Sequence, residues 1–151
     1  MTETYQSKAN SLMDIAVARL RALTDADGAP VFKSVEKRWA DLALTGSSFP
    51  AAQVEPGAVE PSDAENVNTA NARAFHVIVT IFNADGVESA AVQRQTWLVE
   101  KAEDVFRGQK DWIPGHFRTV LGASEPTVLK VHDTPVGVSQ VTAVLHVEYP
   151  W

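Results

Sequence analysis

Residues 75–82 read Phe-His-Val-Ile-Val-Thr-Ile-Phe, and the rest of the predicted fold is arranged around this run. Its odd-numbered residues are all apolar, while the even-numbered ones mix His76 and Thr80 with Ile78 and Phe82. Because successive side chains of a strand point to opposite faces, the run predicts a strand with one fully apolar face and a second that is only half polar. Such a strand is expected at the centre of a sheet or beneath a partner.

Further strands are predicted on both sides of this run. Near the C-terminus, residues 128–132 predict a strand, residues 133–137 a turn, and the alternation of residues 140–149 a long last strand, so that the two strands form a hairpin. Phe49–Val54 predicts a short strand at or near a sheet edge, since the proline near its start lacks an N–H donor. Residues 31–39 predict a partly exposed, basic strand.

Two helices are predicted from apolar residues spaced three or four positions apart. The first runs over about residues 4–23. Its apolar stripe consists of Tyr5, Ala9, Leu12, Ala16, Leu20 and Leu23. The second begins at a capping box formed by Asp85 and Glu88 and ends at Gly108. The connection over residues 109–126 is compatible with one short helix.

These elements predict an α+β fold: a two-layer sandwich in which a mostly antiparallel or mixed sheet carries both main helices on one face. A chain of 151 residues suits one domain with a real core, so residues 1–151 are interpreted as a single domain. The uncovered face of the sheet is then free to meet another subunit.

The composition restricts the functions that the chain can perform. Apolar residues are 45% of the chain and charged residues 21%, which is typical of a folded globular protein. Cysteine is absent, which excludes disulfides, thiolate metal sites and a cysteine nucleophile. The net charge of -6 argues against a protein built to grip nucleic acid. Neither a secretory signal nor a membrane span is expected, which predicts a protein kept in the cytosol or in a particle assembled there.

Residues for catalysis or metal binding do not form any known motif. The four histidines (His76, His116, His132 and His146) lack the spacing that presents two ligands from one helix, and no nucleophile elbow, phosphate loop or dinucleotide fingerprint occurs. The Asp25–Gly28 and Asn83–Gly86 fragments lack the further oxygen ligands of a calcium loop, so they are interpreted as a turn and a helix cap. We therefore expect no enzyme, no cofactor and no metal, and interpret His76 and His146 as a surface or interface pair on neighbouring strands.

Charge is spread unevenly along the chain, because no lysine or arginine lies between Arg38 and Arg73. Residues 55–72 are rich in proline, alanine, asparagine and acid, and predict a projecting arm. The ordinary explanation for the acidic segment is a solvated loop. For Arg94 and Lys101 of the second helix it is side-chain stems that lie along the edge of the core. The alternative is contact between subunits or with another assembly component. The candidate interface residues are Glu55, Glu60, Asp63 and Glu65 of the arm, Lys33, Lys37 and Arg38 of the basic strand, and Arg94, Trp97 and Lys101 of the second helix.

The order of these elements resembles that of the tail terminator (tail completion) proteins of long-tailed bacteriophages. The resemblance rests on an opening amphipathic helix, the phrase Phe49–Val54, a long polar arm, the strand Phe75–Phe82, a helix, and a closing strand that ends in Val147-Glu148-Tyr149. It covers nearly the whole chain, although the connection over residues 109–126 is longer than a minimal member of the family would need.

The resemblance implies a structural virion protein without catalysis or cofactor. Such a subunit forms a ring, expected to be a hexamer, at the head-proximal end of the tail tube, where it stops tube growth and joins the head connector. Its partners would be copies of itself, the tail tube protein and the connector, with DNA passing through the ring without specific binding. It would be assembled in the host bacterial cytoplasm.

Two alternatives remain open at this point. A head-completion or neck connector protein would share the ring and the passage of DNA. From another class, a small α+β ligand-binding domain or hydrolase would use a pocket near Trp112, His116 or His132, and would be a monomer or dimer with a perturbed ionisable group inside that pocket.

Overall fold

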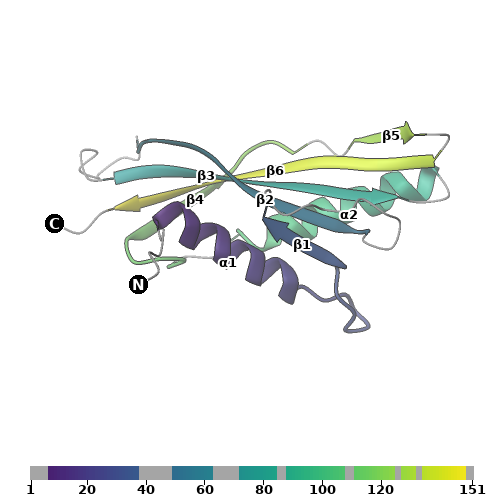
Figure 1. Ribbon diagram of the computed structural model, residues 1–151, viewed down its shortest axis with the longest axis horizontal. Coiled ribbons are helices and arrows are strands. Elements are labelled where there is room, and N and C mark those ends of the chain that lie inside the picture. The colour runs from purple at the N-terminus through teal and green to yellow at the C-terminus, as the bar shows by residue number, and fades with distance from the viewer. Residues whose placement is uncertain are drawn as a thin grey trace, which may run out of the picture.

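The computed structural model describes residues 7–37, 49–62, 72–84, 88–107, 111–124, 127–131 and 134–148. Along the chain its elements are α1 (Lys8–Ala22), β1 (Ser34–Lys37), β2 (Ala51–Pro61), β3 (Ala72–Ala84), α2 (Glu88–Asp104), β4 (His116–Leu121), β5 (Val128–Val131) and β6 (Thr134–Glu148). Figure 1 shows the helices beneath a long twisted sheet. The predicted α+β class is therefore confirmed.

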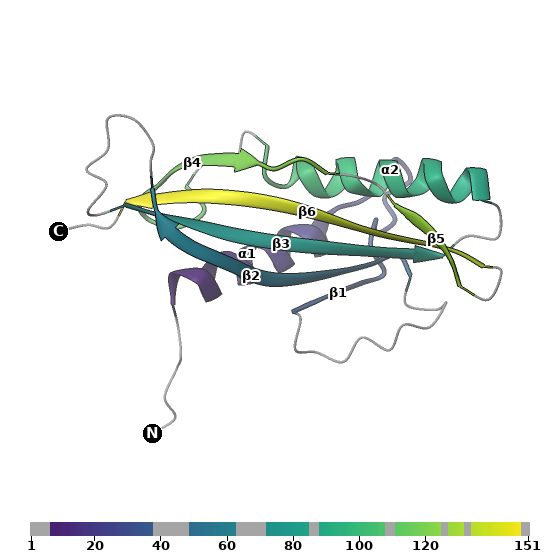
Figure 2. The same ribbon diagram turned by 90° about the horizontal axis from the view of Figure 1, so that it is seen from above.

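The strands form one mixed sheet in the order β1-β2-β3-β6-β4, and β5 pairs with the start of β6. Only the β1–β2 pair is parallel among the strand pairs of the described residues, and the others are antiparallel. Because β3 occupies one side of β6 from Val136 to Glu148, β4 and β5 share the other side. Seen from above, β4 is the outermost strand on the side opposite β1 (Figure 2).

The predicted central strand is confirmed as β3, which lies between β2 and β6. Its ladder with β6 is unbroken from Ala72 opposite Glu148 to Ala84 opposite Val136. The odd-numbered residues 75–83 of β3 are buried, as the apolar alternation predicts. The alternation of the last strand is also confirmed, because Val141, Ala143, Leu145 and Val147 are fully buried.

Both helices pack on the same face of the sheet, as predicted, and share one apolar core with it. On α1 the buried residues are Leu12, Met13, Ala16, Val17 and Leu20, and on α2 and the turn after it they include Leu98, Val99, Ala102, Val105 and Phe106. Helix α1 lies against the β1–β2 side and α2 against β3 and β6 (Figure 2). Each Å² of apolar surface that these side chains remove from water contributes roughly 25 cal/mol to the stability of the fold. The contact between the helices and the sheet therefore stabilises the domain.

A buried amide fixes α2 to the sheet. Gln95 is fully buried, and its Nε2 donates to the carbonyl oxygen of Ile81 at 3.2 Å and to Ser139 Oγ at 3.0 Å. Gly137 makes room for this side chain, because a Cβ at that position would overlap Gln95 Oε1 and Cδ. A polar residue within the apolar stripe thus acts as a positioning contact between the layers.

The predicted helix boundaries are wrong at several ends. Helix α1 begins at Lys8 because Ser7 is extended and its Oγ accepts the Asn10 N–H at 3.1 Å, which makes Ser7 the N-cap. Leu23 is also extended and ends the helix. Residues 1–6, the capping box residue Asp85 and the predicted end Gly108 lie outside the described residues.

The largest corrections concern strands. The strand predicted at Phe49–Val54 is longer than expected, since β2 continues to Pro61. Its predicted place near a sheet edge is confirmed, because its first half lies between β3 and β1, which is the edge strand of the described sheet. Residues 55–61 of the predicted arm are therefore strand, and residues 63–71 lie outside the described part of the chain. The connection 109–126 contains strand β4 and no helix among its described residues.

The remaining strand predictions are confirmed in part. The hairpin of β5 and β6 is confirmed, but β6 already begins at Thr134, so most of the predicted turn at 133–137 belongs to the ladder. The strand predicted over residues 31–39 is shorter, since β1 covers Ser34–Lys37 and Val31 is buried before it. The Asp25–Gly28 segment is a turn, as predicted, in which Asp25 Oδ1 accepts the Asp27 and Ala29 N–H groups.

Candidate interaction surface

One face of the sheet is covered by no helix of the described residues, and we call it the open face. The pairing registers and the alternation of side chains assign its members. They are Gln53, Glu55 and Glu60 of β2, Ala74, His76, Ile78, Thr80 and Phe82 of β3, Val138, Gln140, Thr142, Val144, His146 and Glu148 of β6, and Arg118 and Val120 of β4. Half-buried apolar side chains such as Ile78, Phe82 and Val144 thus alternate with polar and charged ones.

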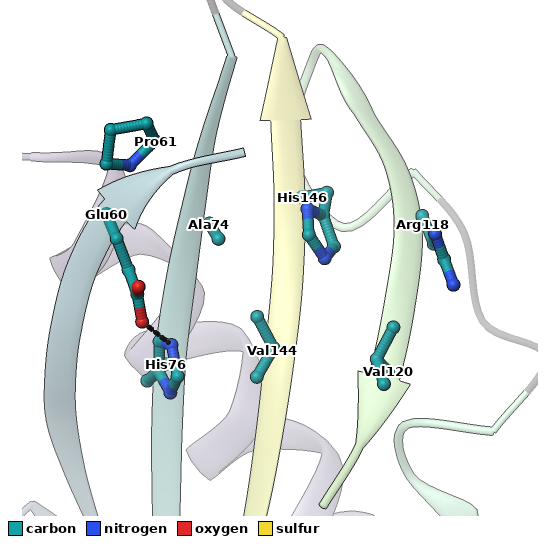
Figure 3. Close-up of a pocket in the computed structure, with 8 residues that line it drawn as sticks. All are labelled: Glu60, Pro61, Ala74, His76, Arg118, Val120, Val144 and His146. Carbon is teal, nitrogen blue, oxygen red and sulfur yellow. Dashed lines mark ion pairs between the residues drawn. The ribbon is translucent and has the colours of Figure 1, made fainter. Parts of the chain in front are cut away.

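A shallow pocket of about 360 Å³ lies at one end of the open face (Figure 3). It crosses four strands, from Glu60 on β2 to Arg118 and Val120 on β4. Glu60 points across it toward His76, whereas Arg118 stands at the opposite rim (Figure 3). The pocket is therefore bounded by a carboxylate on one side and a guanidinium on the other.

The predicted arm residue Glu60 is tied to the sheet. Its Oε1 lies 2.7 Å from His76 Nε2, and its side chain is still 55% exposed. The register of β2 against β3 shifts between Pro56 and Val59, where Gly57 and Ala58 face the single residue His76. A Cβ on Gly57 would lie 2.8 Å from His76 Cβ, so the glycine allows the close approach of the two strands at this bulge.

The second open-face histidine is held by a buried hydroxyl. Ser62 Oγ lies 2.7 Å from His146 Nδ1, and the two residues are only 1% and 5% exposed. The small residues Ala72 and Ala74 of the intervening strand β3 leave the path between them open. This contact joins the end of β2 to β6 across β3. Because the Ser62 hydroxyl is buried, it is not presented to a substrate.

The predicted pair of His76 and His146 lies on one face of neighbouring strands, but the two residues are not directly opposite each other. His76 faces Val144, and His146 faces Ala74, so the two imidazoles are diagonal neighbours. Both line the pocket, and each is bonded to a residue at the end of β2.

The candidate basic strand and acidic arm do not offer all the charges that the sequence suggested. Lys37 forms an ion pair with Asp14 of α1 within the same chain, while Lys33 is exposed before β1. Glu55 lies on the open face opposite Ile78. Arg38, Asp63 and Glu65 are outside the described residues. The charges of Glu60 and Lys37 are therefore partly satisfied inside the subunit.

The flank of α2 is a separate surface. Trp97 is 37% exposed, and the Lys101 ammonium lies 5.6 Å from the centroid of its ring. Arg94 and Trp97 line a wide cleft of about 630 Å³ with Asp25 and Asp27 of the turn after α1. The three candidate residues of the second helix thus lie on one flank, as predicted, and two of them, Arg94 and Trp97, face acidic residues of their own chain.

The alternative site near Trp112 and His116 is a packed cluster. The Trp112 ring stacks on Phe106 at a centroid distance of 5.1 Å, and the Arg19 guanidinium lies 4.4 Å over the Trp112 ring. The backbone N–H of Trp112 donates to His116 Nδ1 at 3.2 Å, so His116 Nε2 carries the ring proton toward Thr119 Oγ1 at 2.7 Å. His132, the third candidate, is outside the described residues.

Burial lowers the pKa of His116 below the usual value for histidine, and its bond to the Arg118 carbonyl only partly opposes this effect. The unfolded chain then binds more protons than the folded one just below the unfolded pKa of about 6.5. The contribution of neutral His116 to the free energy of unfolding is therefore fully present above that pKa. It is lost as the pH falls from the unfolded pKa toward the lower pKa of the folded protein.

The variant His116→Asn keeps an acceptor for the backbone N–H of Trp112. We expect it to lose less stability than the wild type between pH 7 and pH 5. Urea unfolding at several pH values measures the difference. The other histidines are common to both proteins and cancel in this comparison. Equal pH slopes for the two proteins would show that His116 is not held neutral by the fold.

Among the described residues, no three histidine or acidic side chains are grouped to hold a metal ion, and no helix is long and apolar enough to cross a membrane. Of the polar side chains that line the open-face pocket, Glu60 and His76 contact each other, and His146 is bonded to the buried Ser62. Comparison with protein-family models and with curated proteins finds no match to the chain.

Proposed function

We propose that the protein is a structural assembly subunit of a long-tailed bacteriophage, which forms a ring at the head-proximal end of the tail tube. The open face is the main support for this proposal. Its half-buried apolar side chains remain in contact with solvent, although a complete core lies on the other side of the sheet. A subunit that works by contact needs such a face, and the proposed role involves no turnover of a substrate.

The overall charge of the chain suits a ring through which DNA passes. The chain has 19 acidic and 13 basic residues, which give a net charge of -6. Like charge repels phosphate, so DNA would not be held as it passes. A neck connector protein remains the near alternative, because the same surface would serve it, and only its position in the particle separates the two roles.

Capping of tail tubes tests the proposal. Purified protein is added to tail tubes of the phage that encodes it, and electron microscopy counts tube ends that carry a ring. We expect Ile78→Lys, which puts a charge on the open face, to weaken binding to the tube end at least about tenfold, corresponding to roughly 1.4 kcal/mol. Glu100→Lys on the exposed side of α2 is the control and should bind normally.

Two outcomes would count against the proposal. Tube ends that stay bare at every protein concentration would contradict the terminator role. Normal capping by Ile78→Lys would show that the open face is not the contact surface, even if the role is correct.

A further inference from the structure

The sheet ends in two lateral edges beside the open-face pocket. One is the outer side of β4. The other is the outer side of the second half of β2, after the last residue pair with β1, Lys37 opposite Val54. No strand of the described residues lies beyond either edge. Since β2, β3, β6 and β4 are successively antiparallel, β2 and β4 run in opposite directions. A β2 edge of one copy placed beside a β4 edge of another would therefore extend the sheet in its antiparallel order.

The backbone groups of the β4 edge are directed outward at alternate residues. The Gly122 N–H donates to the Thr142 carbonyl at 2.8 Å, so the backbone N–H and C=O groups of Gly122 point to β6. The backbone groups of Val120 and Arg118, which lie two and four residues before it, point the same way. In an antiparallel ladder, Thr119 and Leu121 then present their N–H and C=O groups to the outside. This edge carries no proline.

The β2 edge is more restricted. The Ser62 N–H donates to the Ala72 carbonyl at 3.2 Å, so Glu60 also faces β3, while Val59 and Pro61 face outward. Pro61 offers a carbonyl but no N–H, and Pro56 likewise has no donor. Proline on an edge strand hinders its pairing with an identical edge. The β2 edge therefore suits a partner edge that supplies its own donors, as β4 does.

We infer that β4 of one copy pairs antiparallel with residues 59–61 of β2 in the next copy, so that Arg118 lies opposite the partner's Glu60. This inference rests on the proposed ring, because it names the contact that joins its subunits. Both residues point their backbone groups inward and their side chains to the open face, so they meet as a non-hydrogen-bonded pair, in which the side chains are closest. Thr119 then exchanges backbone hydrogen bonds with the partner's Val59.

Exposure and charge favour this register. Arg118 is exposed, and no carboxylate of the described residues lies within ion-pair distance of it, while the Glu60 side chain is 55% exposed despite its contact with His76. Val59 is 52% exposed, and the pairing places it directly opposite the partner's Thr119. Each copy has one edge of each kind, so the contact is head-to-tail and closes into a ring when the rotation allows.

A cysteine pair tests the contact, because the chain has no cysteine of its own. The double variant Glu60→Cys/Arg118→Cys should form disulfides between copies under mild oxidation. Within one chain the two positions are separated by β3 and β6, roughly 14 Å at the usual strand spacing, which no disulfide can bridge. We expect a ladder of covalent multimers on a denaturing gel, which disappears on reduction.

Matched controls fix the register and the edge. Each single cysteine variant places its cysteine opposite an unchanged Arg118 or Glu60, so it should stay monomeric on the same gel. Thr119→Pro, which removes an outward donor, should reduce multimer formation at least tenfold in the double-cysteine background. Thr119→Val removes the same hydroxyl but keeps the N–H, and should leave the ladder intact. Circular dichroism shows that each variant is folded.

The result separates the contact from the proposed function. Rings seen by electron microscopy without a disulfide ladder would overturn the β4–β2 pairing and leave the ring proposal standing. A folded double variant that shows neither rings nor a ladder, even on tail tubes, would overturn both.

Discussion

Replacing Gly115 by alanine is expected to lower the free energy of unfolding by about 3 kcal/mol or more. Gly115 has a φ of 91°, and it stands where the turn after Trp112 enters β4. A Cβ there would overlap the carbonyl oxygen of Glu148, whose N–H donates to the Gly115 carbonyl at 2.9 Å. The clash is with backbone, so no side-chain rotation relieves it, and β4 or the end of β6 must move.

Gly28→Ala is the matched control for this prediction. Gly28 has a similar φ of 82°, but nothing lies within 4 Å of the Cβ it would gain. That variant bears only the conformational strain, about 1 kcal/mol. Urea denaturation of the three proteins gives the two differences. A Gly115→Ala protein no less stable than Gly28→Ala would show that Gly115 and the end of β6 are not in contact as described.

Replacing Trp112 by alanine is expected to destabilise the protein by about 3–5 kcal/mol. The residue is 4% exposed, and its ring lies between Phe106 after α2 and Arg19 of α1. Truncation leaves a cavity and removes the stacking and cation–π contacts together. The loss should appear in the urea midpoint and in the thermal unfolding temperature.

Trp112→Phe separates packing from polarity at the same position. Trp112 Nε1 is buried without a hydrogen-bond partner among the described residues, so the wild type already bears the cost of an unsatisfied donor. Phenylalanine keeps an aromatic ring beside Phe106 and removes that donor. We expect it to lose less than half of what alanine loses. Equal losses for the two variants would contradict the described stack.

The periodic parts of the fold were predictable because one face of each was buried and the other was not. The strand Phe75–Phe82, the last strand and the core stripes of both helices follow from that contrast. Local rules also explain the turn at Asp25–Gly28. These predictions depend only on residues close in sequence.

The missed strands lack that contrast for physical reasons. Residues 56–61 of β2 are largely exposed, and a bulge at Gly57 interrupts their alternation, so the segment has the composition of a loop. In β4 a second register shift between His116 and Arg118 breaks the period, and Val120 faces solvent. A hydrophobic pattern arises where one face of an element is buried. A strand that is exposed at a sheet edge buries few side chains, so its sequence shows little apolar alternation.

The candidate surface was predictable only in outline. The acidic character of Glu55 and Glu60 and the grouping of Trp97 with Lys101 were visible in the sequence. Contacts between distant positions were not, since pairs such as Lys37 with Asp14 and Glu60 with His76 depend on strand register and helix placement. Arg118 was missed because nothing in its local sequence indicates a sheet edge.

Native mass spectrometry of the purified protein, alone and recovered with tail tubes, tests most directly whether it acts by joining copies of itself. We expect a closed assembly with one fixed number of subunits, present in solution or formed at the tube end. A protein that stays monomeric in both samples over the whole concentration range would show that it does not act by self-assembly.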